Sequence, residues 1–332
     1  AFLGTSSWTL LSLGVFFGVL LIPLTFYGGG RILGFSRSIS ALAALAAATF
    51  RCGDPFGHGL LAYGVQGNGL FGQLWGMNIA ALALPACLAA SVAEGRGLRS
   101  WAPWARTCFA ALLLSALIRS SLPAAWVTMI CASVAVLVLG PYSDLRPRLL
   151  RFTSVLAGAA VLSLGFLVPF LQDLPFAPRS SIEMAPEFIH STGAVETLKQ
   201  LASGTFFDGG QLGLWTPLLI LGVCTPLLVA RKEQERPFIL RGLAIAGLFS
   251  LLLLFGRATW GAWLDQLPLI GRFHDHRYLL GIQLIAPWLC ASVLLDLLGR
   301  AQRIIQPVGK NLILASLVIF VTAPTLAELQ SE

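Results

Sequence analysis

Long apolar runs separated by short polar segments recur along the whole chain. A helix needs about 20 residues to cross the hydrocarbon core of a bilayer. Ten runs approach that length, and they lie near residues 7–27, 38–50, 74–93, 102–118, 122–140, 152–171, 213–230, 237–255, 278–298 and 311–327. The second is short and the fourth contains Arg106, so these two are the weakest. The pattern predicts an all-α, polytopic transmembrane helical bundle of about ten spans, which forms a single transmembrane domain over residues 1–332.

Composition and charge agree with a membrane protein. Charged residues make up 11% of the chain, against roughly 25% in soluble globular proteins, and the mean hydropathy is +0.80. If the first residue is extracytoplasmic, 15 of the 22 Lys and Arg residues fall in the short inward loops. This is the positive-inside pattern. It explains the net charge of +7 without a nucleic-acid partner, which would need a basic stripe on one face.

Three longer segments fall on the outward side, near residues 51–73, 172–212 and 256–277. Function is expected in such loops. In the second loop, apolar residues recur every three positions at Val195, Leu198 and Leu201, with Glu196 and Lys199 between them, which predicts a short amphipathic helix lying on the membrane. Short amphipathic helices in the extracytoplasmic loops are therefore part of the predicted fold.

The first outward loop and a short outward link offer secondary candidates. Asp54 and His58 are four residues apart, so they would share one face of a helix as a ligand pair. A tight loop dipping into the bundle is the alternative. A GxGxxG match at 67–72 lacks the preceding strand of a dinucleotide site. In the link at 119–121, Arg119 either belongs to a plain hairpin or contacts an anion at the outer end of the bundle.

The third outward loop concentrates the polar chemistry of the chain. Two tryptophans, Trp260 and Trp263, stand where a membrane surface would place them. Arginine forks suit phosphate oxygens, and a cluster at a membrane edge suits a lipid headgroup. Three arginines, Arg257, Arg272 and Arg277, are therefore candidates for phosphate binding.

The same loop ends in His274, Asp275 and His276, which allow three interpretations. Two histidines at i and i+2 of an extended segment point the same way and could share a metal ion. Zinc needs three or four ligands, so the metal is unassigned and a divalent cation remains only an open alternative. Hydrogen bonding and ion pairing at a helix entrance is the second interpretation, and phosphate recognition by the neighbouring arginines is the third.

Several chemistries lack a motif in this sequence. There is no Walker motif, no HExxH and no Gly-x-Ser-x-Gly, and the six Cys are scattered without CxxC spacing. No acidic residue stands at the middle of a long apolar run, which argues against an ion-coupled transporter.

Several segments together resemble bacterial polytopic membrane proteins of the GT-C glycosyltransferase superfamily. The likeness is greatest to the group labelled "6-pyruvoyl-tetrahydropterin synthase-related" membrane proteins. It is carried by an early helix-loop-helix at 26–45, by Gly-Leu-Phe-Gly-Gln at 69–73 with the Pro-containing segment 83–89, and by Phe-Gly-Arg at 255–257, Leu-Pro at 267–268 and Phe-His-Asp-His-Arg at 273–277.

The resemblance implies sugar transfer from a polyprenyl-phosphate carrier at the outer face of the bacterial cytoplasmic membrane. It implies that the arginines and histidines of the late loop lie near the carrier phosphate. The acidic residue that such enzymes use in their first outward loop is expected upstream of Ala1, in a longer chain.

Three functions follow in order of preference. The first is a membrane glycosyltransferase-like protein, in which His274, Asp275 and His276 are the catalytic candidates and the three arginines of the late loop bind the lipid-linked sugar. The second is a non-catalytic structural or assembly subunit of a membrane complex on the same scaffold. The third is a transporter.

Overall fold

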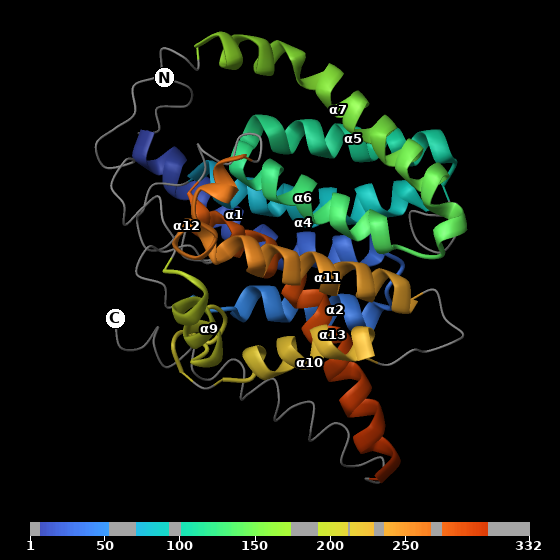
Figure 1. Cartoon of the computed structure of the whole chain (residues 1–332), viewed down its shortest axis with the longest axis vertical. Coiled ribbons are helices and arrows are strands. Elements are labelled where there is room, and N and C mark those ends of the chain that lie inside the picture. Colours follow the sequence, from blue (N-terminus) through green and yellow to red (C-terminus); the bar gives the residue numbers. More distant parts are fainter. Residues whose placement is uncertain are drawn as a thin grey trace.

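The computed structural model describes residues 7–52, 71–92, 101–173, 192–211, 213–228, 236–266 and 274–304. These residues are all-α, as predicted, with an isolated β-bridge as their single extended pairing. The helices, shown in Figure 1, are α1 (Ser7–Ile32), α2 (Arg37–Thr49), α4 (Phe71–Ser91), α5 (Pro103–Ser120), α6 (Leu122–Val138), η3 (Tyr142–Asp144), α7 (Leu145–Asp173), α9 (Ala194–Ala202), α10 (Trp215–Leu228), α11 (Arg236–Leu254), α12 (Gly256–Trp260), η4 (Gly261–Gln266), η6 (Asp275–Tyr278) and α13 (Leu279–Ile304).

Four helices in the described ranges are long and apolar enough to cross a membrane. They are Thr9–Ile32, Gly72–Ser91, Tyr142–Asp173 and Asp275–Arg300. A fifth arises if α11 and α12, which meet at a bend of 75°, count as one broken span. Several long apolar helices indicate a multi-pass membrane protein, whereas its compartment and its orientation stay predictions.

The prediction of about ten spans is wrong for the described residues, and helix length is the main reason. Helices α2, α6 and α10 have 13, 17 and 14 residues. At 1.5 Å per residue they cover about 20, 26 and 21 Å, less than the roughly 30 Å of a hydrocarbon core. Helix α5 has 18 residues, but its two arginines lower its hydropathy. The run near 311–327 lies outside the described residues.

Helix α4 and the first half of α13 form the centre of the bundle, and both are mostly buried. Small residues let their neighbours approach closely. A Cβ added at Gly29 of α1 would stand 2.1 Å from the carbonyl oxygen of Ala81 in α4. The indole nitrogen of Trp288 in α13 donates to the carbonyl oxygen of Phe26 at 3.2 Å. These contacts tie α1 to both central helices.

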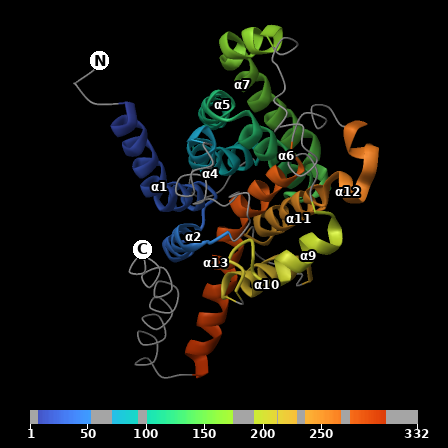
Figure 2. The ribbon, with the colours of Figure 1, turned by 90° about the vertical axis from the view of Figure 1, so that its left-hand side faces the viewer.

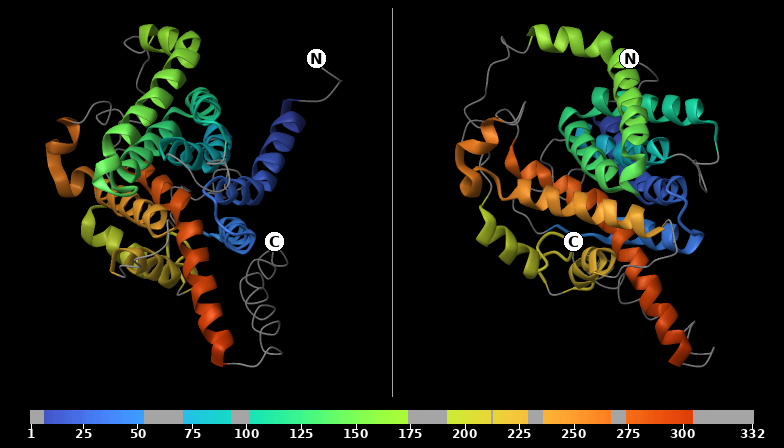
Figure 3. Two further views of the ribbon diagram at one scale, coloured as in Figure 1. Left: turned by 90° about the vertical axis from the view of Figure 1, so that its right-hand side faces the viewer. Right: turned by 45° about the vertical axis from the view of Figure 1, so that its right-hand side comes forward.

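Helices α1 and α7 are peripheral, and much of their apolar surface is exposed. The end of α7 and the second half of α13 project beyond the other helices (Figure 3). Apolar faces of this size are rare on soluble monomers. They are expected where a helix contacts lipid.

Two arginines of the predicted inward side are built into helix ends. Arg106 is 1% exposed and donates to the carbonyl oxygens of Ala89 and Val92 at the end of α4. Arg148 donates to those of Val136, Gly140 and Pro141 after α6. A cation favours the negative end of a helix, where carbonyl groups lack intrahelical partners. Both side chains therefore stabilise the bundle.

The amphipathic helix predicted in the second outward loop is present as α9. The exposed fractions of Val195 and Leu198 are 70% and 48%, whereas Thr197 is 1% exposed. Val195 and Leu198 thus face outward, whereas Thr197 faces the protein and Leu201 packs against the core. Helix α9 lies beside α12, which carries the exposed Trp260 (Figure 2). That this surface rests on a membrane stays a prediction.

Candidate phosphate-binding pocket

The described parts of the three predicted outward loops meet at one end of the bundle. Arg51 forms a parallel bridge with Asp208 of the second loop, through Arg51 N to Phe207 O and Gly209 N to Arg51 O, each at 2.9 Å. Thr259 of the third loop accepts a hydrogen bond from the backbone nitrogen of Ala194, which opens α9, at 2.7 Å. Segments distant in sequence therefore form one surface around the start of α13.

Arg257 and Asp275 form a buried ion pair at this end. The Arg257 Nη1 atom lies 2.6 Å from Asp275 Oδ1, and the Arg257 backbone nitrogen donates to Oδ2 at 2.7 Å. Their side chains are 8% and 0% exposed. The pair joins α12 to η6, the turn that leads into α13. It corresponds to the second interpretation of this segment, ion pairing at a helix entrance.

The two histidines flank the buried carboxylate. The ring centroids of His274 and His276 are 5.3 Å apart, the rings meet edge to face, and both side chains are half-buried. No group of three or more His, Cys, Asp or Glu side chains in the described ranges is arranged to hold a metal ion. Asp54, His58 and Arg272, which were predicted as further site residues, lie outside the described ranges.

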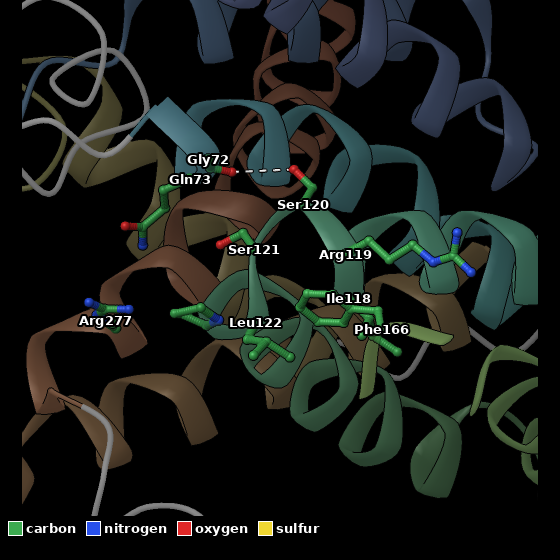
Figure 4. Close-up of a pocket in the computed structure, with 10 residues that line it drawn as sticks. Gly72, Gln73, Ile118, Arg119, Ser120, Ser121, Leu122, Phe166 and Arg277 are labelled. Carbon is green, nitrogen blue, oxygen red and sulfur yellow. Dashed lines mark hydrogen bonds between the residues drawn. The ribbon is translucent and has the colours of Figure 1, made fainter. Parts of the chain in front are cut away.

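A pocket of about 340 Å³ is lined by Arg277, which follows Asp275 of the ion pair by two positions in the sequence. Its wall comes from the first turn of α4, from the hairpin between α5 and α6, from Phe166 of α7, and from Arg277 of η6 (Figure 4). The volume is in the usual range for small-molecule sites. Of the two predicted phosphate-binding arginines in the described ranges, Arg277 lines this pocket and Arg257 does not.

Glycines in α4 let the α5–α6 hairpin approach and close the pocket on one side. A Cβ at Gly72 would stand 3.0 Å from Ser120 O, and one at Gly76 would stand 2.6 Å from the Cβ of Ser121. The Ser120 hydroxyl donates to Gly72 O at 3.4 Å. Ser121 is the N-cap of α6, where its side chain accepts from Ala124 N at 3.4 Å. The first turn of α4 is thereby held against the start of α6.

The lining of the pocket is electropositive. Among the described residues, the lining includes Arg119 and Arg277 and no acidic side chain. The N-terminal ends of α4 and α6 add the partial positive charge of two helix dipoles, and the C-terminal end of α5 offsets about half of it. The Arg119 guanidinium points away from the pocket (Figure 4) and donates to the carbonyl oxygen of Leu162 in α7. Arg119 thus borders the pocket, with its hydrogen-bonding end engaged by α7.

The opposite part of the lining is apolar, with Ile118, Leu122 and Phe166. Phe166 belongs to α7, the peripheral helix whose apolar face is exposed. The pocket therefore combines a cationic end with an apolar wall next to a surface suited to lipid. An amphiphile with an anionic head fits both parts.

Gln73 is a site residue that the sequence did not single out. It lines the pocket and is only 4% exposed. Its Nε2 atom has no hydrogen-bond partner among the described residues. Leaving a buried donor unsatisfied costs about 1–3 kcal/mol. One sequence feature could have identified Gln73: it is a polar residue in the first turn of an apolar helix, at the end of an outward loop.

Comparison of the chain with protein families, with curated proteins and with solved structures found no match. The function must therefore be argued from the pocket itself.

Proposed function

We propose that this protein binds a polyprenyl-phosphate-linked sugar, with the carrier phosphate held at Arg277, and that it acts as a membrane glycosyltransferase. The observation that carries the proposal is an arginine in a pocket whose described lining is electropositive and includes no acidic side chain. Guanidinium groups bind phosphate oxygens through charge-assisted hydrogen bonds. The adjoining apolar wall supports a lipid carrier over a soluble phosphate ester.

In the proposed reaction, a hydroxyl of the acceptor attacks the anomeric carbon of the sugar. The new glycosidic bond forms as the bond from that carbon to the phosphate oxygen breaks, and the carrier phosphate leaves with the electron pair. A cation at Arg277 would stabilise the charge that develops on the leaving phosphate. We assign the hydroxyl proton to His276, which precedes Arg277 in η6, or to His274 at the N-cap of η6.

The ion pair has a positioning role in this proposal. Asp275 anchors η6 through Arg257, and Arg277 follows two residues later, with its backbone nitrogen bonded to His274 O at 3.1 Å. Direct phosphate binding by Arg257 would require its guanidinium to leave a buried carboxylate. We therefore assign phosphate contact to Arg277 and positioning to Arg257.

A test compares Arg277→Ala with Arg146→Ala, using purified protein in nanodiscs. Arg146 is an exposed arginine at the other end of α7, 20 residues or about 30 Å from Phe166 along the helix. We expect Arg277→Ala to weaken the binding of a polyprenyl-phosphate sugar by about 10- to 100-fold, which is the effect of losing a hydrogen bond to a charged group. Arg146→Ala should leave binding unchanged.

Transfer of the sugar to an added acceptor is measured in the same samples. Loss of transfer in Arg277→Ala and His276→Ala supports the enzymatic proposal. Binding that depends on Arg277 without any transfer would favour a non-catalytic subunit that holds the lipid. Equal binding by wild type and Arg277→Ala would remove the proposed site.

A further inference from the structure

The carboxamide of Gln73 is a buried donor at the wall of the pocket. Its Nε2 atom carries two N–H groups and cannot accept a hydrogen bond. It lacks a partner among the described residues although the side chain is 4% exposed. Buried polar groups in native proteins are almost always satisfied, so each exception calls for a physical explanation.

The surroundings of Gln73 indicate what kind of partner is missing. Figure 4 places the amide end of Gln73 on the same side of the pocket as Arg277. A guanidinium is also a donor without acceptor capacity. These two side chains therefore cannot satisfy each other through Nε2, and a group that bridges them must supply acceptor oxygens. The phosphate of a lipid headgroup has several.

We propose that the Gln73 carboxamide donates a hydrogen bond to the same phosphate that Arg277 binds. The first turn of α4 and the turn before α13 then hold one phosphate between them. This inference rests on the proposed function and extends it, because it assigns half of the binding contacts to a neutral residue. Arg277 supplies the charge that distinguishes a phosphate from a neutral headgroup, and Gln73 supplies a directed hydrogen bond that orients the phosphate.

The architecture around Gln73 fits this role. Gly72 precedes it and lets the α5–α6 hairpin approach, and the Ser120 hydroxyl is bonded to the Gly72 carbonyl oxygen. The backbone at Gln73 is thus held in place before a ligand arrives. A preorganised donor loses little entropy on binding.

The test uses wild type, Gln73→Met and Gln73→Glu in nanodiscs of zwitterionic lipid, titrated with a polyprenyl monophosphate. Methionine keeps the length of the side chain and removes the donor. We expect Gln73→Met to bind about tenfold more weakly and to be as stable as wild type or more stable, because no protein hydrogen bond is lost. Gln73→Glu should bind still more weakly, since a carboxylate repels the phosphate.

The outcomes for these variants and for Arg277→Ala separate this inference from the proposed function. If Arg277→Ala loses binding and Gln73→Met binds as wild type does, the phosphate site stands and the role of Gln73 is overturned. If Gln73→Glu binds as wild type does, an acceptor and not a donor faces the ligand, and the role is again overturned. Binding that neither Arg277→Ala nor Gln73→Met alters would refute both proposals.

A competition with inorganic phosphate identifies the source of the phosphate. If millimolar inorganic phosphate leaves lipid binding intact in wild type, the pocket selects a lipid headgroup. If it displaces the lipid, the pocket binds free phosphate, and the inhibition constant of inorganic phosphate should be about tenfold higher in Gln73→Met than in wild type. An inhibition constant that is equal in both proteins would contradict the contact with Gln73.

Discussion

The variant Arg257→Ala tests whether Arg257 stabilises the fold through its ion pair or contacts the ligand. In Arg257→Ala, the Asp275 carboxylate keeps its bond from the backbone nitrogen of residue 257 and loses the guanidinium 2.6 Å away. The gross Coulomb attraction at that distance is about 6 kcal/mol at an effective dielectric constant of 20. Desolvation of both charges offsets part of it. Breaking a buried pair by removing one partner typically costs about 3–5 kcal/mol.

We therefore expect Arg257→Ala to lower the free energy of unfolding by about 3–5 kcal/mol. The assay is denaturant unfolding in mixed micelles, followed by circular dichroism. Arg241→Ala serves as the control, because Arg241 is an exposed arginine of the neighbouring helix α11. Its effect should stay within about 0.5 kcal/mol. The double variant Arg257→Ala with Asp275→Ala should be more stable than Arg257→Ala alone, since it leaves no uncompensated charge.

The alternative predicted from the sequence gives a different result. If Arg257 contacted the carrier phosphate, Arg257→Ala would lose ligand binding while its stability in the absence of ligand remained that of wild type. That outcome would refute the positioning role assigned to the ion pair. A loss of stability that the double variant does not relieve would also contradict it.

Two further results are expected from helix packing and from the membrane surface. Gly29→Ala should destabilise the protein by about 1–3 kcal/mol through overpacking, because the new Cβ would stand 2.1 Å from Ala81 O. The control is Gly165→Ala on α7, where the new Cβ meets nothing within 4 Å and the substitution should be neutral. Unfolding in mixed micelles measures both variants, and equal effects would refute the α1–α4 crossing. Trp263, 76% exposed, should be quenched by lipids brominated near the headgroup more than by lipids brominated at the chain end. Quenching by aqueous iodide alone would show that it faces water.

The all-α fold and the membrane character of the chain could be predicted from the sequence, because both depend on how apolar residues are arranged within single segments. The short helix α9 was predicted from its repeat of apolar residues; two of them, Val195 and Leu198, are exposed, and the third, Leu201, packs against the core. Ion pairing at the entrance to α13 was one of the alternatives drawn from Asp275. Such features need only local information.

Span length was not predictable from apolar runs because helix ends depend on distant partners. The apolar run near 213–230 begins before its helix does. Helix α10 starts at Trp215, where Asp208 accepts hydrogen bonds from the backbone nitrogens of Trp215 and Thr216 at 3.0 and 2.9 Å. A cap supplied by a residue seven positions upstream, in an irregular segment, thus fixes where the helix begins. A hydropathy window cannot detect this.

The composition of the pocket was also only partly predictable. Arg277 was a candidate because arginines cluster near it in sequence. Gln73 was not, because its significance comes from its distance to α6 and η6 and from the lack of a partner for its Nε2 atom. Burial and hydrogen-bond satisfaction are properties of the folded chain. A sequence motif can indicate burial or hydrogen bonding only where the interacting residues are close together in the sequence.

The central claim is that the pocket recognises a phosphate on a lipid. The most direct measurement is native mass spectrometry of the full chain in detergent, with equal amounts of a polyprenyl monophosphate and the polyprenol of the same chain length. We expect one phosphate-bearing lipid to bind and the alcohol to remain unbound, and we expect the difference to disappear in Arg277→Ala. Equal binding of the two lipids to wild type would show that the isoprenoid chain alone is recognised and would contradict the phosphate site.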